Sequence, residues 1–143
     1  MIKFYKFTLL IFLILNTQAI GKEDFFNEAK ILFDNGNIEE SKFLFQRNIV
    51  FNPKHSKSYL YLAKIYETEE NESEEEKNVN TALLLEPNNE EAMYMLIDIK
   101  LKKSDYEKVK EIRAQFEVIC KSLCNKIKSI DERLTNIEAK NES

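Results

Sequence analysis

A 34-residue period runs through most of this chain. Its clearest markers are Pro53 and Pro87, which lie one such period apart. Between these prolines, apolar residues fall on one helical face, and a second helical pattern follows after an acidic stretch. The residues of the first face are Tyr59, Leu62, Ala63 and Tyr66. A repeat of this length, built from two short helices, predicts stacked helical hairpins and favours binding over catalysis as the function.

The period divides the chain into three repeats and a last helix. The repeats fill residues 20–121, at about 22–55, 56–89 and 90–121, and residues 122–143 hold a capping helix and a tail. Only 2 Gly and 2 Pro occur in the 143 residues, which is too few for a turn-rich β fold. We therefore expect an all-α fold: an α-solenoid of three helical hairpins with a C-terminal capping helix, preceded by a signal peptide.

Apolar spacing and turn residues also predict where the helices lie. One helix begins near the end of the acidic stretch Thr68–Glu76 and continues until Pro87, and Gly36 supplies a left-handed cap. The acidic stretch could instead bind calcium, but it lacks alternating ligands and a central Gly, so a solvated face is favoured. The other expected helices are Glu23–Asn35, Ile38–Phe51, Ser58–Glu67, Ala92–Lys102 and Tyr106–Ile119.

Residues 1–19 have the pattern of a secretory signal peptide. Lys3 and Lys6 precede the apolar run Phe7–Leu15, and small Ala19 ends a polar segment. The apolar run is shorter than the roughly 20 residues that span a bilayer, so cleavage is favoured over an uncleaved membrane anchor. We expect an exported product that starts near Ile20, has no stable membrane span after cleavage, and resides in the bacterial periplasm.

The charge balance argues against nucleic acid as the main partner. The whole chain carries 21 basic and 25 acidic residues, a formal charge of −4, and loss of Lys3 and Lys6 with the signal peptide makes this −6. A mildly acidic chain without a basic stripe lacks the electrostatic footprint of a nucleic-acid-binding protein.

Within the second repeat, large and small residues follow a definite order. The first helix reads Tyr59-x-x-Leu62-Ala63-x-x-Tyr66, and the second helix adds Ala82 and the closing Pro87. On these residues the chain resembles a small exported protein of the tetratricopeptide repeat family, over about Asp24–Lys121. Small residues such as Ala29 and Ala63 let neighbouring helices approach closely. The departures from the family pattern are Glu28, Ser41, Glu75, Ile97 and Lys121.

This resemblance implies a concave surface, lined by the first helix of each repeat, that binds an extended or helical segment of a protein partner. Phe26, Leu60 and Tyr94 recur at the 34-residue step and would form a ladder there. The alternative is that these residues pack against neighbouring helices, or against the last helix folded inward. The flanking residues that complete this concave row are Lys30, Phe33, Lys64, Asp98 and Leu101.

The last helix carries a single apolar stripe. Its members follow one another at steps of 4, 3, 4 and 3, and such a stripe must cover another surface. We expect it to seal the open end of the array, with a homodimeric coiled-coil scaffold as the alternative. The stripe consists of Leu123, Ile127, Ile130, Leu134 and Ile137.

Two cysteines, Cys120 and Cys124, lie four positions apart. In an unbroken helix their Cβ atoms would be about 5–6 Å apart, whereas a disulfide needs about 3.5–4.5 Å. Because an even pair in an exported protein usually bonds, we predict a disulfide that closes a corner at Lys121–Leu123. The functional alternative is a redox-active pair in a thiol–disulfide factor, although that chemistry favours Cys-x-x-Cys at a helix N-terminus.

No other pattern predicts catalysis, a cofactor or a metal site. His55 is the only histidine, so neither a histidine metal cluster nor a Ser-His-Asp arrangement is expected, and its linker position favours a solvated side chain. The chain also lacks a Gly-rich phosphate loop. We therefore expect a binding module and no enzyme.

Overall fold

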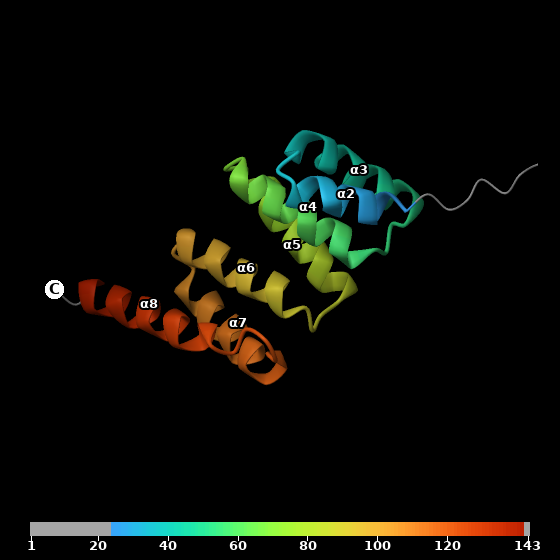
Figure 1. Ribbon diagram of the computed structural model, residues 1–143. Coiled ribbons are helices and arrows are strands. Elements are labelled where there is room, and N and C mark those ends of the chain that lie inside the picture. The colour runs from blue at the N-terminus through green and yellow to red at the C-terminus, as the bar shows by residue number, and fades with distance from the viewer. Residues whose placement is uncertain (1–23, 142–143) are drawn as a thin grey trace, which may run out of the picture.

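The computed structural model describes residues 24–141, with side chains described for residues 24–136. The predicted signal peptide, residues 1–19, lies outside the described residues. Within the described part the chain forms seven α-helices and no strand (Figure 1). The helices are α2 (Phe25–Asp34), α3 (Ile38–Phe51), α4 (Ser56–Thr68), α5 (Glu72–Leu85), α6 (Glu90–Lys102), α7 (Tyr106–Ile119) and α8 (Lys126–Asn141).

Consecutive helices pack on one another along the whole array. The pairs α2–α3, α4–α5 and α6–α7 form three hairpins, and each second helix also contacts the first helix of the next hairpin. Figure 1 shows the three hairpins following one another, with α8 alongside the last. This confirms the predicted fold, an all-α solenoid of three hairpins and a C-terminal capping helix. The bounds of α3 and α7 match their predictions at both ends, while α4 and α6 each begin two positions earlier than predicted.

Four helices begin at a side-chain cap. In each, an aspartate or asparagine oxygen just before the helix accepts a hydrogen bond from the backbone N–H three positions later, which satisfies one of the unpaired amides of the first turn. The capping residues are Asp24, Asn71, Asn89 and Asp105.

The turn inside each hairpin uses one left-handed residue, again at the 34-residue step. Gly36, Glu70 and Ser104 have φ of 81°, 55° and 59°. In each turn, the next residue donates its N–H to the carbonyl five positions back, as in Asn71 to Tyr66 at 2.9 Å. This is the Schellman arrangement, for which glycine is the preferred left-handed residue. Only the first of the three turns has that glycine.

Glycine at the second turn should therefore stabilise the protein. We expect Glu70→Gly to raise the free energy of unfolding by about 0.5–1 kcal/mol, because the left-handed conformation costs an L-residue more than glycine's extra entropy. Urea denaturation measures the change. The adjacent Glu69 has φ −85° and ψ 0°, which any residue adopts, so Glu69→Gly should lower stability. Equal changes of the same sign in both variants would contradict this account.

The core consists of two apolar clusters that meet at α4. Leu62 and Ile65 of α4 pack into the cluster of the first hairpin, while Leu60 and Ala63 pack into the larger cluster that extends to α8. Ala29 and Ala63 are fully buried, as close helix packing requires. Ile97, which stands in the small-residue position of the third repeat, is also fully buried.

A buried polar network joins the first two hairpins. Asn48 Nδ2 donates to Ser58 Oγ at 2.8 Å, and Asn52 Nδ2 donates to Asn48 Oδ1 at 3.1 Å. His55 Nδ1 lies 3.0 Å from the same Ser58 hydroxyl, and its ring centroid lies 4.5 Å from that of Phe26. The expectation that His55 is solvated is therefore wrong: this histidine is half-buried at the junction of two repeats.

Candidate interaction surface

The predicted ladder residues lie at different depths. Leu60 is buried, with 4% of its surface exposed. Phe26 is half-buried, and its ring centroid lies 5.7 Å from those of Phe45 and Tyr61. Tyr94 is also half-buried, at 6.3 Å from the ring of Phe116. Only the two aromatic rungs therefore present surface, and Leu60 lies inside the larger core cluster, against which Tyr94 packs.

The flanking residues of the concave row engage in ion pairs or packing. Lys30 Nζ lies 2.6 Å from Asp34, and Lys64 Nζ lies 2.6 Å from Glu91 across the α4–α6 junction. These four charged side chains are all partly exposed. Two other members of the row are largely covered: Phe33 is half-buried against Tyr61 at a centroid distance of 5.2 Å, and Leu101 is 8% exposed.

Tyr61 joins the aromatic members of this surface, although it was not among the predicted site residues. Its ring stacks on Phe45 at a centroid distance of 5.0 Å and lies edge-to-face with the rings of Phe26 and Phe33. The ammonium of Lys64 lies 4.7 Å from the centroid of the same ring, a cation–π geometry. The sequence could have pointed to Tyr61, because it directly follows the ladder residue Leu60 on a predicted helix.

Helix α8 engages the third-repeat part of the concave row. Arg133 forms an ion pair with Asp98, and Lys126 Nζ lies 5.5 Å from the centroid of the Tyr94 ring. On the other side, Arg113 of α7 makes two parallel hydrogen bonds of 2.8 Å to Asp131 of α8. The third repeat thus holds an amphipathic helix through both charge and apolar contact.

The middle of the predicted apolar stripe is buried within its own chain. Ile130 is fully buried and Leu134 is 9% exposed, both in the larger core cluster. This confirms the capping role, and the structure gives no support to a dimer seam along these residues in this conformation. Leu123 is not part of the helix, because α8 begins only at Lys126. The side chain of Ile137 lies outside the described residues.

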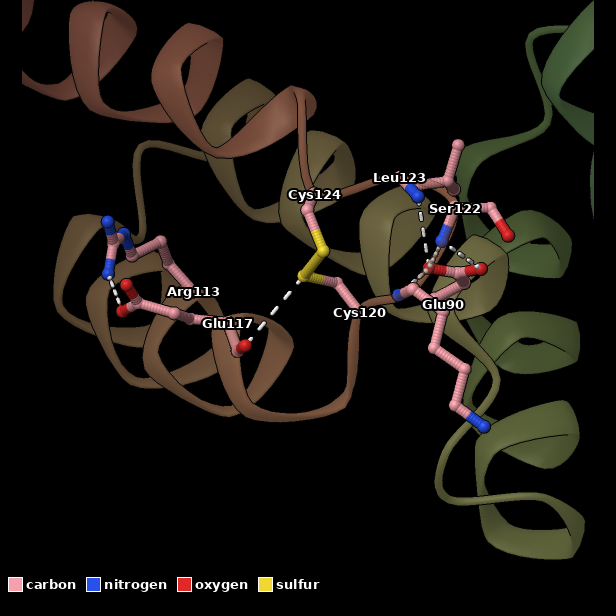
Figure 2. Close-up of a disulfide and its surroundings, with 8 residues drawn as sticks. Glu90, Arg113, Glu117, Cys120, Ser122, Leu123 and Cys124 are labelled. Carbon is pink, nitrogen blue, oxygen red and sulfur yellow. Dashed lines mark hydrogen bonds and ion pairs between the residues drawn. A yellow bond between two sulfur atoms is a disulfide. The ribbon is translucent and has the colours of Figure 1, made fainter.

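Between α7 and α8 the chain turns a tight corner, where Cys120 and Cys124 form a disulfide (Figure 2). Their Cα atoms are 5.2 Å apart. Helix α7 ends at Ile119, so the predicted disulfide and the predicted break in the helix occur together. Cys120 is the C-terminal cap of α7, where the helix dipole disfavours a thiolate, and this weighs against a reactive redox pair.

The same corner is held from outside by Glu90, the first residue of α6. Its carboxylate accepts hydrogen bonds from the backbone N–H groups of Lys121 at 2.8 Å, Ser122 at 3.0 Å and Leu123 at 3.1 Å. Figure 2 shows this carboxylate lying among the amides of the disulfide loop. These backbone hydrogen bonds lower the pKa of Glu90 to about 2. Glu90 was not among the predicted site residues.

Comparisons with known proteins bear on the fold. No protein-family model and no curated protein sequence matches the chain. Among solved structures, the Sgt2 TPR domain from Aspergillus fumigatus is 13% identical with a TM-score of 0.69, covering 85% of this chain and 82% of that chain. The Yersinia enterocolitica type III secretion translocator chaperone SycD, in an alternative dimer, is also 13% identical at a TM-score of 0.69, with coverages of 85% and 94%.

A third match is the CopN–Scc3 complex, at 20% identity and a TM-score of 0.63, covering 82% of this chain and 71% of that chain. The chain has the fold of a tetratricopeptide array. In this array Lys121 stands one 34-residue step after Pro87, at the position of a closing proline. The disulfide and Glu90 therefore end the third repeat where a proline ends the first two.

The described part of the tetratricopeptide array contains no cluster of metal ligands and no helix that could span a membrane. Among the side chains of residues 24–136, no three His, Cys, Asp or Glu gather as metal ligands. Over the same residues, none of the helices is both long and apolar enough to cross a membrane. The concave row presents aromatic side chains and partly exposed ion pairs.

The low pKa of Glu90 predicts an acid-sensitive corner. A carboxylate whose pKa falls from 4.5 to about 2 on folding contributes stability that is complete above pH 4.5 and is lost as the pH falls towards 2. We expect the amides of Lys121–Leu123 to lose protection over that range, measured by hydrogen exchange as the ratio of the intrinsic to the observed exchange rate at each pH.

Glu90→Gln should remove this acid dependence and speed the same exchange already at neutral pH. Glu72→Gln is the matched control, because Glu72 is likewise the first residue of its helix but is exposed and distant in sequence from the corner. Identical behaviour of the two variants at Lys121–Leu123 would show that Glu90 does not hold the corner.

Proposed function

We propose that this chain is a protein-binding module of the bacterial periplasm, which holds a partner segment along α2, α4 and α6 during assembly of an envelope complex. One observation carries the proposal. The third repeat binds an amphipathic helix of its own chain through Tyr94 and Asp98, and Phe26, Lys30 and Lys64 occupy the equivalent positions of the earlier repeats.

The charges of the first two repeats indicate what kind of segment would bind. Lys30 and Lys64 stand at 34-residue steps from Asp98, so the sign of the charge is reversed relative to the third repeat. Their ion pairs with Asp34 and Glu91 are partly exposed, and water screens such pairs so that they contribute little to stability. A partner carboxylate can therefore replace either acid.

Aromatic side chains supply the apolar half of the same surface. Phe26, Phe33 and Tyr61 form one contiguous group beside Lys64. An amphipathic segment with acidic residues on one side and apolar residues on the other would match both features. We infer such an acidic amphipathic segment as the partner element.

Three further observations support the compartment and the type of function. The N-terminal pattern is that of a cleaved signal peptide, and a disulfide is typical of exported proteins. Two of the similar structures are named as a translocator chaperone and as a complex. Cell fractionation tests the compartment directly: the protein should be found in the periplasm without residues 1–19.

Site-specific photo-crosslinking in the producing cells would identify the partner. A photoreactive residue in place of Lys64 should trap it, whereas one in place of Lys77, which is 69% exposed on α5, should not. With the partner in hand, Lys30→Glu combined with Lys64→Glu should weaken binding by about tenfold or more, because like charges would then meet. Lys77→Glu is the control. Unchanged affinity of the double variant would refute the proposed surface.

A further inference from the structure

The sequence around the corner is that of one continuous helix. From Val109 to Ile137 apolar residues follow one another at steps of three or four across both α7 and α8. No Pro or Gly occurs after Pro87, so the two residues that most strongly end a helix are absent, although Asn125 lies in the corner. The apolar positions are 109, 112, 116, 119, 123, 127, 130, 134 and 137.

Two contacts hold the chain in its bent form. The disulfide brings Cys120 and Cys124 closer than a continuous helix allows. Glu90 accepts the N–H groups of residues 121–123. In a continuous helix those same amides would donate to the carbonyls of residues 117–119, so Glu90 takes the place of the helical acceptors.

We propose that this disulfide is a conformational switch that decides which array α8 caps. With the bond intact, α8 folds back on its own α6 and α7. After reduction by a dithiol, α7 and α8 join into one helix and α8 docks on α6 and α7 of a second copy. In that step the dithiol gives two electrons and two protons to the cystine, its own sulfurs form a disulfide, and Cys120 and Cys124 become thiols.

The second copy follows from the length of a straight helix. Arg113 and Asp131 are 18 residues apart, which in a continuous helix separates them by about 27 Å, so their ion pair cannot survive within one chain. Exchange of α8 between two copies restores that pair, the Arg133–Asp98 pair and the burial of Ile130. Exchange of an identical element in this way is a low-cost route to a dimer.

The molar mass in solution of the mature chain, without residues 1–19, tests the switch. The oxidised protein should be a monomer by light scattering, and incubation with dithiothreitol should double the molar mass. Cys120→Ser combined with Cys124→Ser should give the dimer without reductant. In both dimers the amides of α8 should stay as protected from hydrogen exchange as in the oxidised monomer, because α8 is docked in each state.

A proline placed at the corner tests whether the dimer forms because α7 and α8 join into one helix. Lys121→Pro in the cysteine-free background should restore the monomer, because proline cannot continue the helix and stands where Pro53 and Pro87 end their repeats. Lys121→Ala in the same background is the matched control and should leave the dimer. A reduced protein that stays monomeric, a dimer that survives Lys121→Pro, or a reduced chain that no longer unfolds cooperatively would each overturn the proposal.

Discussion

Replacing Phe45 with alanine is expected to lower the free energy of unfolding by about 3–5 kcal/mol, the largest loss foreseen for one substitution in this chain. Phe45 lies in α3 and is fully buried. Its ring centroid lies 5.7 Å from that of Phe26 in α2 and 5.0 Å from that of Tyr61 in α4. Its removal leaves a cavity at the point where the first hairpin meets the second. Since small domains are stable by about 5–15 kcal/mol, the urea midpoint should fall markedly.

Phe43 provides the control on the same helix. It is the same residue type two positions away, but 60% of its surface is exposed. Phe43→Ala should change the free energy of unfolding by no more than about 0.5 kcal/mol, because exposed side chains leave no cavity. Similar losses in the two variants would mean that the first hairpin is not organised around Phe45.

The fold could be predicted because the same pattern of apolar residues and turn residues occurs three times along the chain. Pro53 and Pro87 fix the step, and the step then places every hairpin. Local signals set the ends of helices: residues that can cap a first turn, and a left-handed residue at each hairpin turn. Glu70 and Ser104 show the limit of residue-type reasoning, because the array imposes a left-handed turn on residues that do not favour it.

The interaction surface was harder to predict, because a repeat shows which positions are equivalent but not which neighbours cover them. Leu60 and Leu101 belong to the concave row by register, yet both are buried. Asp98 has no evident partner in the repeat pattern, whereas in the structure its partner Arg133 lies 35 residues away on α8. Such long-range pairs depend on where the last helix lies, which the period alone does not determine.

The corner between α7 and α8 contains one feature that the sequence predicted and one that it did not. The disulfide was predictable because an even pair of cysteines in an exported protein usually bonds, and bond geometry then excludes a continuous helix between Cys120 and Cys124. The role of Glu90 was not predictable, because its partners are backbone amides at least 31 residues away. Every residue except proline has such an amide, so the residue types do not show which amides Glu90 contacts. Sequence reasoning therefore identified the bend but not the carboxylate that holds its amides.

A substitution at Glu75 is expected to stabilise the protein. Glu75 is 2% exposed and follows Ser41 at the 34-residue step, at a position that small residues usually fill. Its ion pair with Lys102 Nζ spans 3.9 Å, beyond hydrogen-bond distance. Because a buried charge with such weak compensation is costly, Glu75→Gln should raise the free energy of unfolding at pH 7 by about 1–3 kcal/mol, measured by urea denaturation.

The pH dependence of this gain distinguishes charge from packing. Burial raises the pKa of Glu75 above its ordinary 4.5, and Glu67, Glu72 and Asp98 add to that effect while Lys102 opposes it. The folded state therefore holds the proton more tightly, so stability is greatest below pH 4.5 and is lost as the pH rises through the raised pKa. The advantage of Glu75→Gln should vanish near pH 4 and grow towards neutrality. Glu40→Gln, at an exposed position of α3, should show no such growth. A constant advantage at all pH values would assign the effect to side-chain shape, and the buried charge would then not be its cause.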